Sequence, residues 1–258
     1  MDTAAIALQL YTVRAEMARD PRETLRHVAE IGYTAVEGGG ADSPGEMPAL
    51  LPALGLRQVS AMVRLDALET DLDRQIDYCR AVGCRYLVLS WLEPDWRSGA
   101  ALCVLAPRLD AVGSRCRERG IRFAYHNHDF EFAQHEGAYM LDILLGATDP
   151  ALVALEFDIY WAAYAGVDPL EVLRAYPGRV PLVHLKDMAA DRSFADLGEG
   201  TLDLPTICAA ARPAGADWFI VENDEPRAPA LDSARRSWAY LRDLLPGCGV
   251  PAAPGAVE

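Results

Sequence analysis

Ionisable side chains gather at the ends of four successive apolar runs in the second half of the chain. These runs end in His126-Asn127-His128, Glu156-Phe157-Asp158, His184-Leu185-Lys186 and Glu222-Asn223-Asp224. Carboxylates and imidazoles are the groups that hold divalent cations and that move protons in catalysis. If the four runs are neighbouring parallel strands, their carboxyl ends meet at one rim. The pattern therefore predicts one polar site built from all four.

The alternation of side chains along each run indicates which groups face inward. Glu156 and Asp158 share one face of their run, and His184 shares a face with Lys186. Two carboxylates inside a barrel would repel unless a cation, a basic partner or protonation relieved them. A divalent metal is the simplest relief, and an oxygen-rich set favours Mn²⁺, Mg²⁺ or Co²⁺, with Zn²⁺ as a further option. The predicted ligands are Glu131, Asp158, His184 and Glu222.

Other interpretations of these residues stay open at this stage. Glu131 follows its run in a loop and could be a solvated surface residue, in which case His128 or His126 could take its place. Asp158 could cap the next helix. Lys186 could form an ion pair with a neighbouring acid or contact a substrate.

Aromatic and polar residues near the other strand ends favour a sugar-binding surface. Tyr11, Trp91, Trp96 and Trp161 follow predicted strands, where aromatic rings could stack on the apolar faces of sugars, although core packing would explain each singly. Gly38-Gly39-Gly40 lacks the spacing of a phosphate-binding loop. The predicted substrate-binding residues are Gln9, Tyr11, Glu37, Trp91, His126, His128, Trp161 and Lys186.

Eight apolar runs alternate with helical patterns along the chain. The predicted strands are 6–11, 35–38, 58–63, 86–90, 122–126, 153–158, 182–186 and 218–223. The predicted helices are 21–31, 72–82, 101–119, 169–176, 205–211 and 231–245, the first with Asp20 as its N-cap and Gly32 as its stop. Parallel strands need such long crossovers, and about 250 residues is typical of a closed (β/α)8 TIM barrel. A doubly wound sheet would also fit the pattern, but the count of eight favours the barrel.

Composition limits the classes of protein. The 258 residues carry 24 Lys and Arg against 38 Asp and Glu, a net charge of −14, which disfavours nucleic acid as a partner. No apolar run reaches the length of a membrane span, and the N-terminus resembles no secretory signal. Six cysteines without a CxxC pair indicate reduced thiols, so we expect a cytoplasmic protein. We expect one barrel domain over 1–245 and a flexible tail over 246–258; the oligomeric state stays open.

Several motifs, taken together and in this order, resemble the sugar phosphate isomerase/epimerase family of xylose-isomerase-like TIM barrels. The motifs are Gln9-Leu10-Tyr11-Thr12-Val13-Arg14, Tyr125-His126-Asn127-His128-Asp129-Phe130-Glu131, Asp158-Ile159-Tyr160-Trp161, His184-Leu185-Lys186-Asp187, Gly198-Glu199-Gly200 and Val221-Glu222-Asn223-Asp224. The resemblance implies a divalent metal held by side chains from strands five to eight, and proton transfer beside a sugar carbonyl. The family's ligands from strands six to eight correspond to Asp158, His184 and Glu222. Many relatives carry the fifth-strand glutamate where this chain has Tyr125 or His126.

The predicted activity is that of a metal-dependent sugar isomerase or epimerase that abstracts a proton next to a carbonyl. Glu131 and Glu222 would be the acid and base, and Lys186 or His128 would polarise an oxygen. The same site would serve a dehydratase acting on an inosose or keto-glycoside, because loss of a β-hydroxyl follows from the same intermediate. A sugar-binding barrel without turnover, or a partner subunit, is a further alternative. A DNA-repair endonuclease is disfavoured by the charge. The lack of an Arg/Lys clamp at the rim favours an unphosphorylated substrate.

Overall fold

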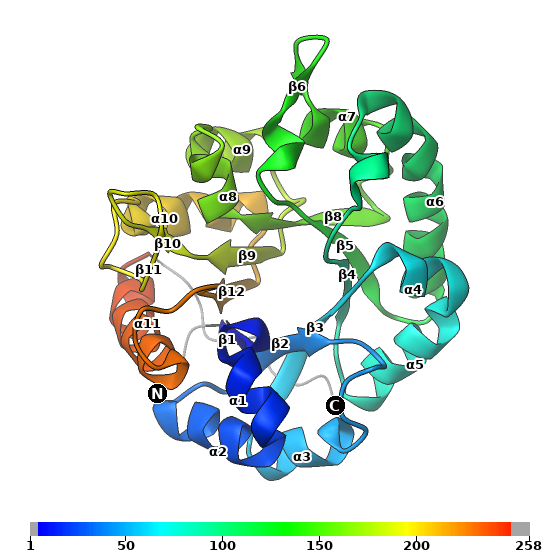
Figure 1. The fold of residues 1–258 in the computed structure, drawn as a ribbon. Helices are drawn as coiled ribbons and strands as arrows, with labels where there is room; N and C mark the ends of the chain where they lie inside the picture. The colour runs from blue at the N-terminus through cyan, green and yellow to red at the C-terminus, as the bar shows by residue number, and fades with distance from the viewer. Residues whose placement is uncertain (1–4, 249–258) are drawn as a thin grey trace.

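Eight parallel strands close into a barrel, and helices surround it (Figure 1). The computed structural model describes residues 5–248. Around the barrel the strands follow one another in the order β1, β2, β3, β4, β5, β8, β9 and β12, and β12 pairs with β1. They span Ile6–Gln9, Ala35–Gly39, Arg57–Val63, Tyr86–Leu89, Arg122–His126, Val153–Asp158, Leu182–Leu185 and Trp218–Val221. All eight predicted strands and the (β/α)8 architecture are therefore confirmed.

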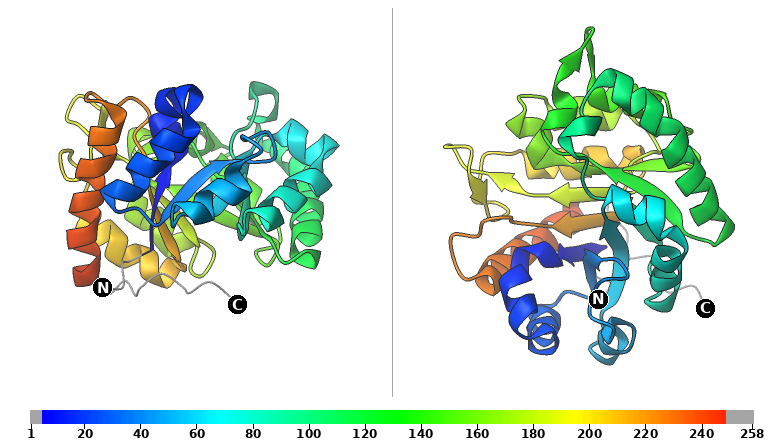
Figure 2. Two further views of the ribbon diagram at one scale, coloured as in Figure 1. Left: turned by 90° about the horizontal axis from the view of Figure 1, so that it is seen from below. Right: turned by 45° about the vertical axis from the view of Figure 1, so that its right-hand side comes forward.

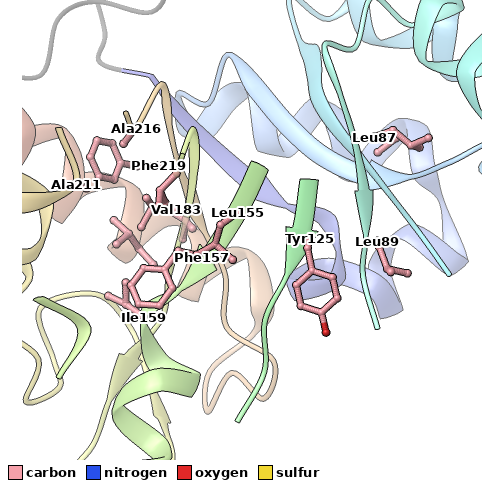
Figure 3. Close-up of a cluster of buried hydrophobic side chains, with 14 of the residues drawn as sticks. Leu87, Leu89, Tyr125, Leu155, Phe157, Ile159, Val183, Ala211, Ala216 and Phe219 are labelled. Carbon is pink, nitrogen blue, oxygen red and sulfur yellow. The ribbon is translucent and has the colours of Figure 1, made fainter. Parts of the chain in front are cut away.

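The inner and outer faces of the strands differ in chemistry. Inside the barrel, small and apolar side chains such as Ala7, Val88, Ala124 and Ile220 fill the part nearer the amino ends of the strands. Outward-facing side chains join the larger core under the helices. Figure 3 shows Leu155, Phe157, Val183 and Phe219 of three neighbouring strands gathered in this outer core. The polar inward positions are therefore left to the carboxyl ends of the strands.

The six predicted helices are present, with ends within three residues of those expected. They are α2 Pro21–Ile31, α5 Leu72–Ala81, α6 Gly99–Glu118, α9 Pro169–Ala175, α10 Leu204–Ala214 and α11 Ala230–Leu244. The N-cap prediction for α2 is confirmed, because the Asp20 side chain accepts a hydrogen bond from the Glu23 amide. Gly32 follows α2 with a φ of 122°, a conformation that glycine adopts without steric cost.

Shorter helices complete the loops and were not predicted. The α-helices are α1 Arg14–Arg19, α3 Met47–Ala53, α4 Leu65–Thr70, α7 Met140–Gly146 and α8 Ile159–Tyr164. The 3₁₀ helices are η1 Leu10–Val13, η2 Pro94–Trp96, η3 Phe130–Phe132 and η4 Leu245–Cys248. Residues 246–248 of the predicted tail belong to η4, and the rest of that tail lies outside the described residues. In the described part of the chain no helix is long and apolar enough to cross a membrane.

Two small antiparallel hairpins extend the loops beyond the barrel (Figure 2). The first pairs β6 Gln134–His135 with β7 Ala138–Tyr139 through Glu136 and Gly137, which both have positive φ. This is the conformation of a tight two-residue hairpin turn. The second pairs β10 Asp187–Met188 with β11 Phe194–Ala195. Its Phe194 ring stacks on Tyr160, with 4.4 Å between ring centres, so this hairpin packs against the helix α8 that follows β8.

Candidate active site

A cavity of about 680 Å³ opens at the carboxyl ends of the barrel strands. Its lining includes both acidic and basic groups together with aromatic rings. Of the predicted substrate-binding residues, those that line it are Gln9, Tyr11, Trp91, His126, His128, Trp161 and Lys186. Glu37 is not among the lining residues, and Trp96 borders a separate, smaller pocket. The site therefore lies where parallel-barrel enzymes place theirs.

Three of the four predicted metal ligands meet below this cavity, and one of them, Glu222, lines it. The Nδ1 atom of His184 lies 2.8 Å from Oε2 of Glu222 and 4.0 Å from Oδ2 of Asp158. Asp158 and His184 have no exposed surface, and Glu222 is also buried. The three can each offer one ligand atom to a common point, with all of these atoms within 4.8 Å of one another. The predicted convergence of strands β8, β9 and β12 is therefore seen in the structure.

The two carboxylate oxygens of Asp158 have different partners: Oδ1 faces the first turn of α8, and Oδ2 faces the cluster. Oδ1 accepts hydrogen bonds from the amides of Tyr160 and Trp161, at 2.9 and 3.2 Å, and so caps α8. Oδ2 points toward the cluster and accepts no hydrogen bond, although Lys186 Nζ lies 3.1 Å away. A buried carboxylate oxygen without a hydrogen bond is costly unless a cation is close. Capping and cation binding are therefore compatible in this residue.

Lys186 supplies the positive charge of the cluster. Its Nζ atom lies 2.9 Å from Oε2 of Glu222 and 3.1 Å from both carboxylate oxygens of Asp224. Burial alone would lower the pKa of Lys186, but the carboxylates of Asp158, Glu222 and Asp224 raise it well above its usual value. Lys186 is thus a charged ion-pair partner that also lines the cavity, so both predicted roles are open to it.

A second polar layer lies directly below the first. Glu37 on β2 and Glu156 on β8 are fully buried, with His126 of β5 beside them. His126 Nδ1 lies 3.1 Å from Oε2 of Glu156, and His126 Nε2 lies 3.9 Å from Oδ2 of Asp158. His126 and His184 therefore each stand between the two layers, with one nitrogen toward each. His126, Glu156 and His184 form a second group with metal-ligand spacing.

The buried carboxyl and imidazole groups around the lower layer differ in their tendency to carry a charge. Burial and the neighbouring charge of Glu37 raise the pKa of Glu156 well above its usual value, which favours a protonated carboxyl. Burial would also raise the pKa of Glu37, but His184 holds it below the usual value. Burial opposes a charge on His184, yet Glu37 and Glu156 raise its pKa well above normal. Burial lowers the pKa of His126, so this imidazole is neutral.

Glu131 does not join the cluster. Its two oxygens accept hydrogen bonds from the Tyr125 hydroxyl and, at 2.8 Å, from the His128 amide. Glu131 lies in η3, is 1% exposed and belongs to neither group with metal-ligand spacing. Burial raises its pKa to about 7. The residue predicted as a ligand and acid–base group therefore braces the loop after β5, and His126 is the β5 residue beside the cluster.

Glu37 also departs from its prediction as a substrate-binding residue. It is fully buried, and its carboxylate accepts hydrogen bonds from Gln9 Nε2 at 2.6 Å and from the Ser60 hydroxyl. His184 Nε2 lies 2.6 Å from Oε1 of Glu37, the same oxygen that accepts from Gln9. No surface remains for a sugar hydroxyl. Gln9 lies above it and reaches the cavity.

Aromatic rings form one wall of the cavity around His128. The His128 ring lies 4.6 Å from Trp91 and 5.7 Å from Trp161, measured between ring centres. Burial lowers the pKa of His128 to about 3, so its imidazole is neutral. His128 Nδ1 and Trp161 Nε1 are buried and have no hydrogen-bond partner. Apolar faces combined with free polar atoms suit a ligand rich in hydroxyl groups.

Four charged residues of the lining were not among the predicted site residues, namely Arg14, Arg64, Asp129 and Asp224. Asp224 binds Lys186, and Arg14 and Arg64 border the opening. Arg14 donates a hydrogen bond to the Tyr11 carbonyl, and Arg64 forms an ion pair with Glu93. Arg14 is the first residue of the short helix α1 and Arg64 directly follows β3, so neither lies in a stretch long enough for periodicity to carry a signal. The sequence position of Asp224, two residues after Glu222, was the signal available for that residue.

The donor set fits a divalent cation. Two carboxylates and an imidazole converge, Asp158 Oδ2 lacks a hydrogen bond, and the group opens onto a cavity. The cluster lies at the carboxyl rim of a parallel barrel, which is where such barrels carry their active sites. The family model for the xylose isomerase-like TIM barrel matches residues 25–244, and the chain belongs to this family.

Relatives and solved structures agree with this class. An inosose dehydratase of Geobacillus kaustophilus is 28% identical over 81% of both chains, and one of Clostridium perfringens strain 13 is 38% identical over 58% of this chain and 55% of its own length. The chain thus spans only about half the length of most of the dehydratases it matches. A Parabacteroides distasonis sugar phosphate isomerase/epimerase structure superposes with a TM-score of 0.80, at 23% identity over 94% of both chains.

A structure of the IOLI protein with a bound zinc atom superposes with a TM-score of 0.71, at 14% identity, over 94% of this chain and 98% of that one. The sequence-based prediction covered both an isomerase or epimerase and a dehydratase. The names of the curated relatives favour the dehydratase alternative over the main prediction.

Proposed function

We propose that this protein is a metal-dependent dehydratase that removes water from an inosose or a related unphosphorylated keto-sugar. The observation that carries the proposal is the meeting of Asp158, His184 and Glu222 below the cavity, where the buried Oδ2 of Asp158 accepts no hydrogen bond and has Lys186 beside it. The inosose dehydratase relatives support the reaction class. Arg64 is paired with Glu93, and three carboxylates surround Lys186, which supports a substrate without phosphate.

The proposed metal ligands are Asp158, His184 and Glu222, with His126 as the fourth. His126 takes the place that sequence analysis gave to Glu131, because its Nε2 atom lies 3.9 Å from Asp158 Oδ2. Two oxygens and two imidazole nitrogens suit Mn²⁺, Co²⁺ or Zn²⁺ better than Mg²⁺. Such a cation would act as a Lewis acid on the carbonyl oxygen of the substrate.

The chain's own residues would manage the protons. Glu222 borders the cavity and would take the proton from the carbon beside the carbonyl. The electron pair left on that carbon then forms the double bond as the hydroxyl leaves the next carbon, and that hydroxyl departs as water with the proton that Glu222 took up. Lys186, charged and facing the cavity, would bind a substrate oxygen that gains negative charge. His128 and Trp161 would orient the hydroxyl groups through their unbonded nitrogens.

The test is a reaction in D₂O with the metal-loaded protein and a panel of keto-inositols and keto-sugars. We expect NMR to show loss of water from at least one keto-inositol, and we expect turnover lowered by about 10²–10⁴-fold in a Glu222→Gln variant. Deuterium exchange beside the carbonyl with a rearranged sugar and no loss of water would instead establish the isomerase or epimerase alternative. Binding of a sugar with neither exchange nor product would establish a non-catalytic barrel. Turnover restricted to phosphorylated sugars would contradict the proposed substrate class.

A further inference from the structure

Glu37 is fully buried below the cavity and touches the cluster at one point, the Nε2 atom of His184. Glu37 and His184 are 147 residues apart in sequence, on β2 and β9, so their contact crosses the interior of the barrel. We propose that Glu37 is a positioning residue that fixes the ring orientation and tautomer of His184 for cation binding. This inference rests on the proposed function, because it assigns a partner to one of the proposed ligands.

The hydrogen bonds around Glu37 make it a hydrogen-bond acceptor toward His184. Gln9 Nε2 donates to Oε1 at 2.6 Å, and the Ser60 hydroxyl donates to Oε2. The oxygen of Gln9 accepts from the Tyr11 amide at 3.0 Å, which fixes the direction of the Gln9 amide group. Glu37 is therefore held as an acceptor by donors on both of its oxygens. The nitrogen that faces it must donate as well, so His184 carries its hydrogen on Nε2.

This tautomer decides what the other face of the ring can do. In the metal-free protein Nδ1 also faces a carboxylate, that of Glu222, so both ring nitrogens carry a hydrogen. A bound cation would displace the hydrogen of Nδ1, and Glu37 would keep the remaining hydrogen on Nε2, which leaves the electron pair of Nδ1 for the cation. Nδ1 is the atom that lies 2.8 Å from Glu222 and 4.0 Å from Asp158. The opposite tautomer would place a hydrogen at that point and exclude a cation. Carboxylates commonly orient metal-binding histidines in this way, and their loss typically weakens metal binding by about 10–100-fold.

The second carboxylate of the lower layer does not replace Glu37. Glu156 Oε2 lies 3.5 Å from His184 Nε2, and neither oxygen of Glu156 forms a hydrogen bond with a defined donor. Glu156 stands closer to His126, at 3.1 Å. The contact of His184 with Glu37, at 2.6 Å, is therefore the shorter one, and it is the one that forms a hydrogen bond.

The experiment compares three variants of the full chain. Glu37→Gln keeps the shape but removes the charge, and Glu37→Met removes the acceptor. Ser60→Ala is the matched control, because it deletes a neighbouring hydrogen bond of the same carboxylate and leaves His184 paired. Zn²⁺ affinity is measured by competition with a chelating dye. We expect about 10–100-fold weaker binding for both Glu37 variants and less than about 3-fold for Ser60→Ala.

A second readout reports on the tautomer directly. In the Zn²⁺-loaded wild type, the proton on His184 Nε2 should give a far-downfield NMR signal, since it bonds to an anionic carboxylate. The signal should move upfield in Glu37→Gln and stay in place in Ser60→Ala. If Glu37→Met does not fold, the Zn²⁺ affinity and the NMR signal of Glu37→Gln alone test the inference. Unchanged affinity and an unchanged signal in Glu37→Gln would overturn the inference. A wild type that binds no divalent cation would instead overturn the proposed metal site itself.

Discussion

Replacing Lys186 by methionine should make the stability of the protein depend on a divalent cation. Lys186 Nζ lies within 3.1 Å of oxygens of Asp158, Glu222 and Asp224, and its side chain is 3% exposed. Removing one partner of a buried ion pair typically costs about 3–5 kcal/mol, because the other charges stay buried without compensation. In a domain of this size, 1 kcal/mol corresponds to roughly 2–4 °C in Tm. We therefore expect Tm to fall by about 6–20 °C in metal-free buffer.

Added metal should restore much of this loss. A cation that binds only the folded state stabilises it by about 2.7 kcal/mol at 100 times its Kd. The assay is thermal unfolding of Lys186→Met with EDTA and with Mn²⁺. Arg108→Met serves as the control, because the Arg108–Glu69 pair is about half exposed and such pairs contribute less than about 1 kcal/mol. A Lys186→Met protein as stable as the wild type in EDTA would refute the reasoning.

Three further changes test separate parts of the structure. Glu222→Gln should lower turnover by about 10²–10⁴-fold with unchanged circular dichroism, and a loss below 10-fold would contradict its role as base. The pKa of Glu131 is about 7 in the folded protein and near 4.5 in the unfolded chain, so the native state binds the proton more tightly. In urea titrations, the stability of the wild type relative to Glu131→Gln should therefore fall by about 3 kcal/mol as pH rises from 4.5 to above 7. A stability difference that does not change with pH would count against burial as the cause of the raised pKa. Phe157→Ala should lower the free energy of unfolding by about 3–5 kcal/mol in the same assay, since Phe157 fills the outer core. A loss under 1 kcal/mol would show that the neighbouring side chains fill the space left by the ring.

The barrel was predictable because its strands are buried on both faces. Runs such as Val153–Asp158 and Leu182–Leu185 are nearly continuous in apolar residues, which is typical of parallel strands. The short helices were missed for an equally physical reason. Met47–Ala53 and Ile159–Tyr164 are too short to show a helical period, and they are held by packing and, in the second case, by the Asp158 cap.

The site residues that could be predicted are those whose direction follows from the alternation of side chains along a strand. Asp158, His184 and Glu222 follow from inward positions at strand ends. The position of Glu131 outside the cluster could not be predicted in this way, because the turn at η3 brings its carboxylate back to Tyr125 of the preceding strand, β5. The role of Glu37 depends on a contact across the barrel, which no local pattern encodes.

The central claim is that Asp158, His184 and Glu222 bind one divalent cation. The most direct measurement is a titration of the metal-stripped protein with Mn²⁺, with free Mn²⁺ followed by its electron paramagnetic resonance signal. We expect one ion bound per chain in the wild type and a loss of that binding in Asp158→Asn. No bound ion in the wild type, or equal binding in Asp158→Asn, would contradict the account.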